Sequence, residues 1–429
     1  MKSSVSSFLS RHNFVNHVDI YSVAQAILDD MRKGLRKEKA DEDMIRTFCN
    51  PPESSAKGKS VIVIDAGGTN FRSCLVTFDA DGIPQISDME KTKMPGVEKE
   101  LSRKDFFAQI ADNLEHLKNK SDRIGFCFSY PMEIKENGDG ILLGFSKEVK
   151  APEVVGCEVG RCLKEALTER GWNSIKRITL CNDTVAALLA GAACATDADS
   201  YSSYIGFILG TGMNAAYIQP DCDCCKVKKQ IIVCESGKFL SVNRSDFDIE
   251  FDKTTVKPGT FFLEKLCSGA YLGPVSLIAL KAAARDGLFA SETADRILAI
   301  ESLSLIEMDK FLHGPFNTEC ILGAIADKAS KEDADSIFQI LDAIVERSAR
   351  YSAAILIACA IQTGEGKNAS EPICILCDGT TFFKTWRIKE RVYGYLDKIL
   401  TEELGIYWNI VSCDNDITLG AAISGLIEG

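Results

Sequence analysis

The chain has 429 residues, of which 46% are hydrophobic and 26% charged, which is enough material for two ordinary domains with sizeable cores. This composition excludes a disordered tail, a fibre and a mini-protein. The formal net charge is −12, from 49 Lys and Arg against 61 Asp and Glu. Because a negatively charged protein repels nucleic acids and anionic membrane surfaces, we expect neither as a partner.

The sequence predicts a soluble, cytoplasmic protein. Residues 1–30 contain no secretory apolar run, and no later stretch reaches about 18 apolar residues without a charge. The 17 cysteines are odd in number and scattered along apolar segments, as reduced core thiols are. We therefore expect a reducing compartment and no disulfide framework.

The first predicted elements are a helix and a three-stranded meander. Apolar residues at helical spacing predict a helix over about 20–35. After a small polar stretch, the continuous β-branched run at 61–64 predicts a buried strand. Residues 71–78 predict a second strand and 83–87 a third, which Pro84 places at a sheet edge. Short turns between the three predict an antiparallel arrangement.

Helices and strands then alternate, which predicts an α/β fold. A capping pattern begins a helix after Ser102. Strands are expected at 124–129 and 178–181, with a helix over about 160–169 between them and another after Asp183.

An approximate internal repeat indicates two similar halves. Residues 61–78 and 204–219 each read as strand, Gly-Thr turn and strand, and 373–381 is a looser match. Two such sheets would present glycine turns that face one another across a cleft. Helices dominate between about 262 and 361, where the run 348–362 is apolar nearly all round and predicts a buried helix.

The two glycine turns are candidate phosphate sites. Asp65 and the turn 67–70 directly follow a buried strand, where backbone N–H groups can meet phosphate oxygens. Asp65 could hold a hydrated Mg²⁺, and Arg72 follows on the next strand. The second turn, 210–212, has no acid before it. The alternative is a plain hairpin turn in which glycine supplies a positive φ. No P-loop or Gly-x-Gly-x-x-Gly is present, which disfavours a Rossmann dehydrogenase and a protein kinase.

Hydrogen-bond acceptors recur at predicted strand ends and helix starts. Asn182 and Asp183 stand between a strand and a helix, where they either cap the helix or serve as a base for a hydroxyl. Asn214, Glu235 and Glu264 would add to such a site, although an acid at a helix start is also favoured by the helix dipole. A site rich in acceptors and poor in cations suits a neutral polyhydroxyl ligand.

Together these motifs resemble those of the hexokinase family of sugar kinases, in the actin/Hsp70-like ATPase superfamily, over nearly the whole chain. The matching segments are IDAGGTNFR (64–72), GFCFSYP (125–131), FSKEVKAP (145–152), CNDTVAALLAG (181–191), ILGTGMNAAY (208–217), EKLCSGAYLG (264–273) and CDGTTFFK (377–384). Seven segments in the family's order are far more specific than any one alone. The resemblance implies two RNase H-like domains that flank a cleft, with a helical part in the larger one.

The resemblance also implies roles for individual residues. Asp183 would be the general base on the primary hydroxyl of the sugar, Lys147 a cation beside the reacting oxygen, and Asp65 the residue that positions Mg²⁺ through water. The sugar would contact Ser129, Ser146, Lys147, Asn182, Asp183, Asn214, Glu235 and Glu264. The nucleotide would contact Gly67, Gly68, Thr69, Asn70, Arg72, Gly210, Thr211, Gly212, Gly379 and Thr380.

The implied reaction converts Mg·ATP and a hexose, glucose by default and mannose or fructose otherwise, into hexose 6-phosphate and ADP. Phosphoryl transfer depends chiefly on positioning, so an Asp of ordinary pKa could serve as the base. Domain closure over the sugar would exclude water. The alternatives are a catalytically weak sugar sensor, a sugar-independent actin- or Hsp70-like ATPase, and a sugar kinase of the ROK family. The protein is expected as a monomer or homodimer.

The resemblance and the linkers predict a small domain of 59–182 with 415–429, and a large domain of 1–58 with 183–414. Ser236 stands where many members have Trp, and Met213 where they have Thr, which bears on sugar choice and phosphate affinity.

The cysteine-rich segment 221–225 could bind zinc, as such segments do in ROK proteins. None of the four histidines lies beside it, so we expect a surface hairpin with reduced thiols.

Overall fold

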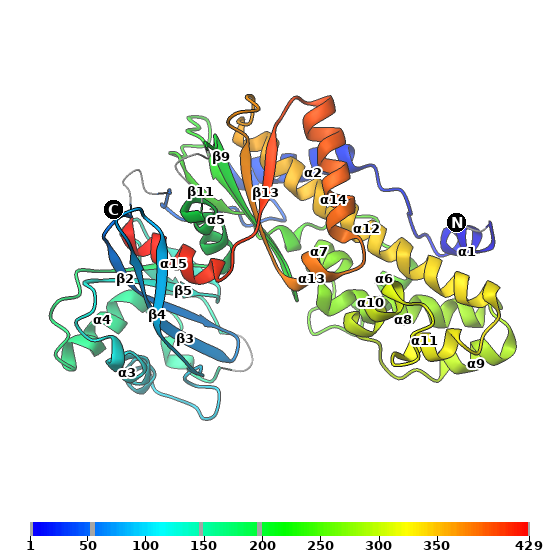
Figure 1. The fold of residues 1–429 in the computed structure, drawn as a ribbon, viewed down its shortest axis with the longest axis horizontal. Helices are drawn as coiled ribbons and strands as arrows, with labels where there is room; N and C mark the ends of the chain where they lie inside the picture. Colours follow the sequence, from blue (N-terminus) through cyan, green and yellow to red (C-terminus); the bar gives the residue numbers. More distant parts are fainter. Residues whose placement is uncertain (1–2, 52–55, 146–148, 195–199, 428–429) are drawn as a thin grey trace.

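The computed structural model describes residues 3–51, 56–145, 149–194 and 200–427. Its strands form a five-stranded sheet, a six-stranded sheet and a two-stranded ribbon. The two large sheets lie in separate lobes, and a mostly helical part extends beyond the larger sheet (Figure 1). This is the predicted α/β arrangement of two sheet-containing halves.

The five-stranded sheet has the order β4-β3-β2-β5-β8. Its strands are β2 (Ser60–Gly67), β3 (Asn70–Phe78), β4 (Pro84–Lys93), β5 (Arg123–Phe128) and β8 (Arg177–Cys181). The first three form the predicted antiparallel meander, with β4 at the edge, whereas β2, β5 and β8 run parallel. The β-branched run 61–64 is fully buried, as its composition predicts.

Helices and short elements cover this sheet. They are α3 (Arg103–Asn113), η1 (Glu115–Leu117), β6 (Met132–Ile134), β7 (Gly140–Leu142), η2 (Pro152–Val154) and α4 (Val159–Glu169). The predicted cap of α3 is present, because the Ser102 hydroxyl accepts a hydrogen bond from the Asp105 N–H at 3.1 Å. The helix α3 ends at Asn113. Leu117, which is also buried, lies on the separate 3-10 helix η1.

The six-stranded sheet has the order β1-β11-β10-β9-β12-β13. Its strands are β1 (Ile45–Arg46), β9 (Ser203–Leu209), β10 (Met213–Gln219), β11 (Gln230–Val233), β12 (Ile373–Asp378) and β13 (Trp408–Val411). The hairpins β2–β3 and β9–β10 confirm the internal repeat. The third match differs, because β12 pairs in parallel with β9 and a helix, not a second strand, follows Gly379.

The helical part contains α12 (Lys331–Thr363). The buried helix predicted over 348–362 is its C-terminal half, and the helix begins 17 residues earlier than the apolar run. The predicted N-terminal helix, α2 (Ile20–Leu35), packs against α12. The other helices are α1 (Ser3–Arg11), η3 (Ser236–Lys238), α6 (Asp246–Asp252), α7 (Phe262–Cys267), α8 (Gly269–Arg285), α9 (Ser291–Leu298), α10 (Leu305–His313), α11 (Ile321–Ala326), α13 (Thr380–Lys384), α14 (Ile388–Leu396) and the π-helix η4 (Asp397–Glu403).

Two helices, α5 (Asp183–Cys194) and α15 (Asp416–Leu426), pack against each other between the two large sheets (Figure 1). A Cβ atom at Gly420 would lie 1.7 Å from the Ala186 carbonyl oxygen, so the two backbones touch there. α15 lies within 415–429, the segment predicted to return to the small domain. Among the helices in the described part of the chain, none combines the length and the apolar character that a membrane crossing requires.

Candidate active site

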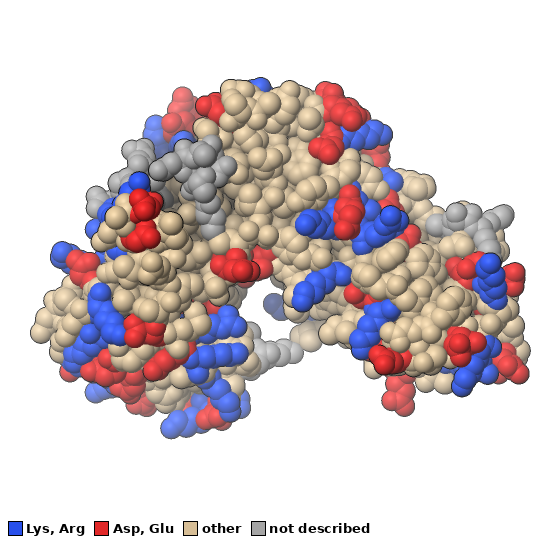
Figure 2. Space-filling model, viewed as in Figure 1, with Lys and Arg blue, Asp and Glu red and all other residues tan. Residues whose placement is uncertain are grey.

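A cleft of about 500 Å³ opens between the two large sheets. The surface is hollowed between the lobe of β3 and β4 and the helical part (Figure 2). The cleft lining includes every described residue that was predicted to bind sugar: Ser129, Asn182, Asp183, Asn214, Glu235 and Glu264. Ser146 and Lys147, the other two predicted sugar contacts, fall outside the described residues.

Asp183 is the first residue of α5, directly after β8. The helix is capped by its neighbour, because the Asn182 side-chain oxygen accepts a hydrogen bond from the Val185 N–H at 2.8 Å. Asp183 Oδ1 accepts two hydrogen bonds from Thr184, one from the backbone N–H at 2.7 Å and one from the side-chain hydroxyl at 3.2 Å. Asn182 therefore caps the helix, as one interpretation predicts, and both residues line the cleft.

Burial raises the pKa of Asp183, and the negative charges of Asp65 and Asp378 raise it further. The two Thr184 hydrogen bonds only partly offset this rise. The carboxylate is thus a better proton acceptor than the ordinary Asp that the sequence suggested, because desolvation in the cleft disfavours its charged form.

Asn214 and Glu235 hold each other in place. The Asn214 amide nitrogen donates to Glu235 Oε1 at 2.9 Å, and the Glu235 N–H donates to Asn214 Oδ1 at 3.0 Å. Glu235 has a left-handed backbone, with φ of 58°, which turns the chain out of β11 and into the cleft. Burial raises the pKa of Glu235, and the nearby Lys238 lowers it.

Glu264, on α7, connects the sugar side of the cleft to the second glycine turn. Its Oε2 accepts a hydrogen bond from the Met213 N–H at 3.1 Å, and its Oε1 accepts one from the Tyr271 hydroxyl at 3.3 Å. A Cβ atom at Gly212 would lie 2.9 Å from Glu264 Oε2. A larger residue at 212 would push this carboxylate away from the turn. Burial raises the pKa of Glu264.

The first glycine turn adjoins the same cleft. It closes the β2–β3 hairpin, and a Cβ atom at Gly67 would lie 2.9 Å from the Ser129 Cβ. The Tyr130 hydroxyl donates to the Gly68 carbonyl at 2.9 Å. Gly68, Thr69 and Asn70 are exposed. The turn is thus both a hairpin and a backbone surface beside residues that were predicted to bind sugar.

The second glycine turn, 210–212, lies beside the other residues that were predicted to bind the nucleotide, Gly379 and Thr380. The Gly210 carbonyl accepts hydrogen bonds from the Gly269 N–H and the Thr381 hydroxyl, each at 2.8 Å. A Cβ atom at Gly379, where φ is 110°, would lie 2.2 Å from the Leu209 carbonyl oxygen. Gly210, Gly379 and the exposed Thr380 after it therefore lie together, although Gly212 is the one predicted nucleotide residue among the cleft-lining residues described.

The residues near Asp65 fit a hydrated magnesium ion. Arg72 Nη1 lies 3.2 Å from Asp65 Oδ2, and burial raises the pKa of Asp65 while Arg72 lowers it. Burial, with the charges of Asp378 and Asp65, raises the pKa of Asp416 to about 7. Carboxylate oxygens are the donors that Mg²⁺ prefers, and a cation would relieve the repulsion among these acids.

Comparisons with known proteins agree with this geometry. One hexokinase family model matches residues 204–427 and a second matches residues 6–193. The chain belongs to the hexokinase family. It is 27% identical to Hexokinase-1 of Schizosaccharomyces pombe, over 95% of this chain and 87% of the relative. It is 30% identical to human Hexokinase HKDC1 over 86% of this chain, but it spans only 42% of that longer relative.

Solved structures confirm the fold of this hexokinase. The Schistosoma mansoni hexokinase complexed with glucose superposes with a TM-score of 0.77 at 23% identity, covering 99% of both chains. A ROK hexokinase from Thermus thermophilus gives a TM-score of 0.50 at 16% identity, covering 86% of this chain and 98% of that one. The fold is therefore nearer to the first than to the ROK enzyme.

The cleft lining of this hexokinase also contains lysines that no sequence motif indicated. Lys238 and Lys257 both line it, beside the predicted acceptors. Lys238 Nζ lies 2.5 Å from Asp43 Oδ2 and 3.7 Å from Glu235 Oε2. Lys238 follows Glu235 by three residues, a local signal that could have been read. Asp43 comes from a distant segment, and no local pattern pairs it with Lys238.

Proposed function

We propose that this hexokinase transfers the γ-phosphoryl group of Mg·ATP to the 6-hydroxyl of glucose, giving glucose 6-phosphate and ADP. The observation that carries the proposal is the convergence of Asp183, a set of hydroxyl-binding side chains and two glycine turns on one cleft. The Schistosoma hexokinase of the same fold is complexed with glucose, which supports glucose as the sugar.

In this proposal, Asp183 accepts the proton of the sugar 6-hydroxyl. At the same time, the oxygen of that hydroxyl forms a bond to the γ-phosphorus. The bond between that phosphorus and the β–γ bridging oxygen breaks, and ADP leaves. Asn182, Asn214, Glu235, Glu264 and Ser129 orient the sugar through its hydroxyl groups. Mutual hydrogen bonds hold Asn214 and Glu235 in position before sugar arrives, so little ordering is left to binding.

The glycine turns would supply backbone N–H groups to the phosphates, because the absence of a Cβ lets phosphate oxygens approach the chain. When bound with ATP, Mg²⁺ neutralises phosphate charge, and Asp65 would hold it through water. From the family resemblance alone, we also assign Lys147 to the reacting oxygen and Ser146 to the sugar.

The larger-scale expectations are part of the same proposal. The small domain, 59–182 with 415–429, would close on the large domain, 1–58 with 183–414, when sugar binds. The protein would act in the cytoplasm, as a monomer or homodimer, at the start of glycolysis. Support for a reducing compartment comes from the 17 cysteines, which are odd in number and scattered along apolar segments.

The test is ADP release by the purified protein with Mg·ATP. The panel is glucose, mannose, fructose, galactose, N-acetylglucosamine and no sugar. Release that depends on glucose supports the proposal. Release that is indifferent to sugar would instead indicate an actin- or Hsp70-like ATPase. Glucose binding measured by calorimetry without any ADP release would indicate a sugar sensor.

A further inference from the structure

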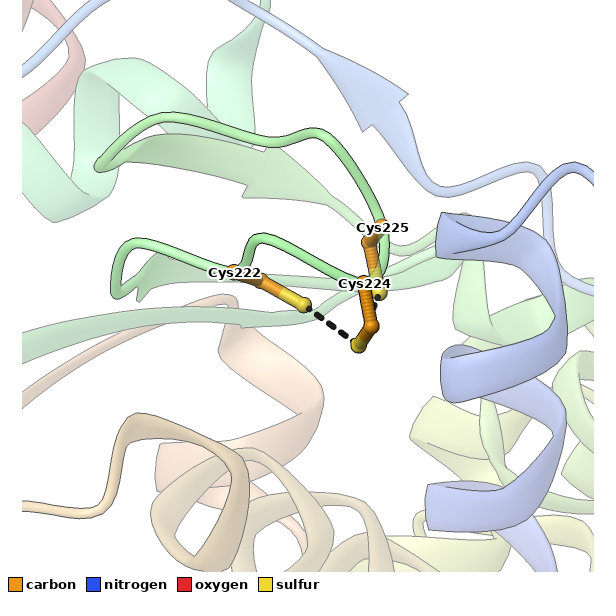
Figure 3. A group of neighbouring side chains, drawn as sticks. All are labelled: Cys222, Cys224 and Cys225. Carbon is orange, nitrogen blue, oxygen red and sulfur yellow. Dashed lines mark hydrogen bonds between the residues drawn. The ribbon is translucent and has the colours of Figure 1, made fainter.

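The loop between β10 and β11 brings three thiols together (Figure 3). Cys222 Sγ lies 3.2 Å from Cys224 Sγ, which lies 3.6 Å from Cys225 Sγ. All three sulfur atoms lie within 4.8 Å of one another. The surface hairpin with reduced thiols that the sequence predicts is therefore present, but its thiols form one group.

The loop backbone holds this shape by contacts that need no metal. Cys222 and Val227 exchange two backbone hydrogen bonds, of 2.8 and 3.0 Å. Asp221 Oδ1 accepts a hydrogen bond from the Lys229 N–H at 2.9 Å, and Arg46 Nη2 donates to the Cys225 carbonyl at 3.2 Å. Because the turn is anchored at both ends and at its tip, the three sulfur atoms are brought together before any ion binds.

The sulfur spacing matches what a zinc ion requires. Around a tetrahedral Zn²⁺ ion with Zn–S bonds of ~2.3 Å, neighbouring sulfur atoms lie about 3.8 Å apart. The observed separations of 3.2 and 3.6 Å are slightly shorter than that value, and the third pair lies within 4.8 Å. They are far longer than the ~2.05 Å of a disulfide bond.

The surroundings also favour a bound cation that carries thiolates. Cys224 is exposed and the other two are half-buried, so an ion can reach them. Three thiolates with Zn²⁺ carry one net negative charge, which the adjacent Arg46 guanidinium can offset.

We propose that Cys222, Cys224 and Cys225 bind one Zn²⁺ ion, with water in the fourth position. Within the described residues the group contains no further Cys, His, Asp or Glu ligand, which leaves that position to solvent. Binding forms three Zn–S bonds and releases the thiol protons to the buffer. The ion stabilises the end of the β10–β11 hairpin opposite the sugar cleft.

The site is separate from the phosphoryl-transfer chemistry. Asn214 stands at the other end of β10, and the five residues from it to Gln219 span roughly 17 Å of strand. The thiols are therefore not expected to touch sugar or nucleotide, and the proposal stands or fails independently of the proposed function.

The experiment measures zinc per chain by elemental mass spectrometry. The full chain is reduced, stripped with a chelator, loaded with Zn²⁺ and desalted. The variant is Cys222→Ser/Cys224→Ser/Cys225→Ser, and the matched control is Cys157→Ser, a half-buried thiol elsewhere. We expect about one zinc per chain in the parent and the control and none in the triple variant. Circular dichroism of the stripped proteins checks that all three fold alike.

A second measurement keeps the proposal falsifiable if the triple variant misfolds. Co²⁺ replaces Zn²⁺ in the stripped parent, and thiolate-to-cobalt charge-transfer bands with tetrahedral d–d absorption are expected. A cobalt spectrum without those bands, no retained zinc in the parent, or equal zinc in a folded triple variant would overturn the proposal. So would a disulfide between two of these cysteines, located by peptide mapping of the parent after the chelator step.

Discussion

Asp183 lies near other acidic side chains. Its pKa is raised by burial and by Asp65 and Asp378, whereas its neighbour Asn182 is neutral and caps the helix. Asn182 and Asp183 thus have different roles, because both line the cleft but only Asp183 is ionisable. This arrangement makes the acid–base behaviour of the site depend on residues that do not touch the sugar hydroxyl.

We expect Asp183→Asn to lower kcat by at least about 100-fold, because the amide cannot accept the hydroxyl proton. Calorimetric glucose affinity should change only a few-fold, since shape and the Thr184 contacts are conserved. Glu402→Gln, at an exposed acid on η4, serves as the control in the same coupled assay. Unchanged turnover in Asp183→Asn would contradict the assigned base.

The raised pKa of Asp183 sets the acid limb of the pH profile. As pH falls through this pKa, the carboxyl becomes protonated and kcat is lost. Asp378→Asn removes a like charge, so it should lower the Asp183 pKa and move the acid limb of kcat to lower pH. An acid limb that stays in place, or moves to higher pH, would contradict this electrostatic coupling.

At the scale of elements, close backbone contacts decide how helices and strands meet. α5 and α15 touch at Gly420, and α5 approaches β9 at Gly206, where a Cβ atom would lie 2.6 Å from the Thr184 carbonyl oxygen. Because backbone atoms cannot move aside, larger residues would push the elements apart. The helix that carries Asp183 is positioned by these contacts.

Gly420→Ala should lower the free energy of unfolding by about 1–3 kcal/mol, because its Cβ would overlap Ala186. Gly394 is the matched control, since it is exposed within α14 and a Cβ there meets nothing within 4 Å. Gly394→Ala should stabilise by about 0.5–1 kcal/mol through helix propensity. Urea unfolding measures both, and equal effects would show that the α5–α15 contact is not tight.

α12 and α6 are connected by a buried ion pair. Arg347 Nη1 and Nη2 donate to the two oxygens of Asp248 at 2.7 and 2.8 Å, and both side chains are almost fully buried. Asp248 also caps α6 through Ser245. The pair therefore fixes the start of α6 against the long central helix.

Arg347→Met should cost about 3–5 kcal/mol of unfolding free energy, because it leaves a buried carboxylate without its partner. Arg347→Met/Asp248→Asn should recover part of that loss, since the amide is neutral and keeps an oxygen for the cap. The same urea experiment compares them. A double variant less stable than the single one would show that the charge imbalance is not the cause.

At the scale of the whole molecule, the cleft is built from both large sheets, with α5 and α15 packed between them. Residues proposed to bind one sugar come from separate lobes: Ser129 follows β5, whereas Asn214 lies on β10. A ligand held by both lobes favours their approach, because its hydroxyl groups are then satisfied on both sides.

Glucose should therefore reduce the radius of gyration in small-angle X-ray scattering. Galactose, whose 4-hydroxyl has the opposite configuration, should do so less at equal concentration, because one partner in the site is left unpaired. Glu235→Gln is expected to weaken the glucose-dependent change. A radius that does not respond to glucose at saturation would exclude sugar-driven closure.

The sequence by itself determined the elements and the family. The β-branched run at 61–64, the edge position of Pro84 and the glycine turns are local patterns, and local backbone preferences set them. The ordered motifs predicted which acids and amides meet in the cleft.

Only the tertiary structure decided the pairing of Lys238 with Asp43, the helix after Gly379 and the gathering of Cys222 with Cys224 and Cys225. These depend on how segments distant in the chain pack or how a loop folds back. Distances between side chains and the burial that shifts the pKa of Asp183 arise only when the whole chain is folded.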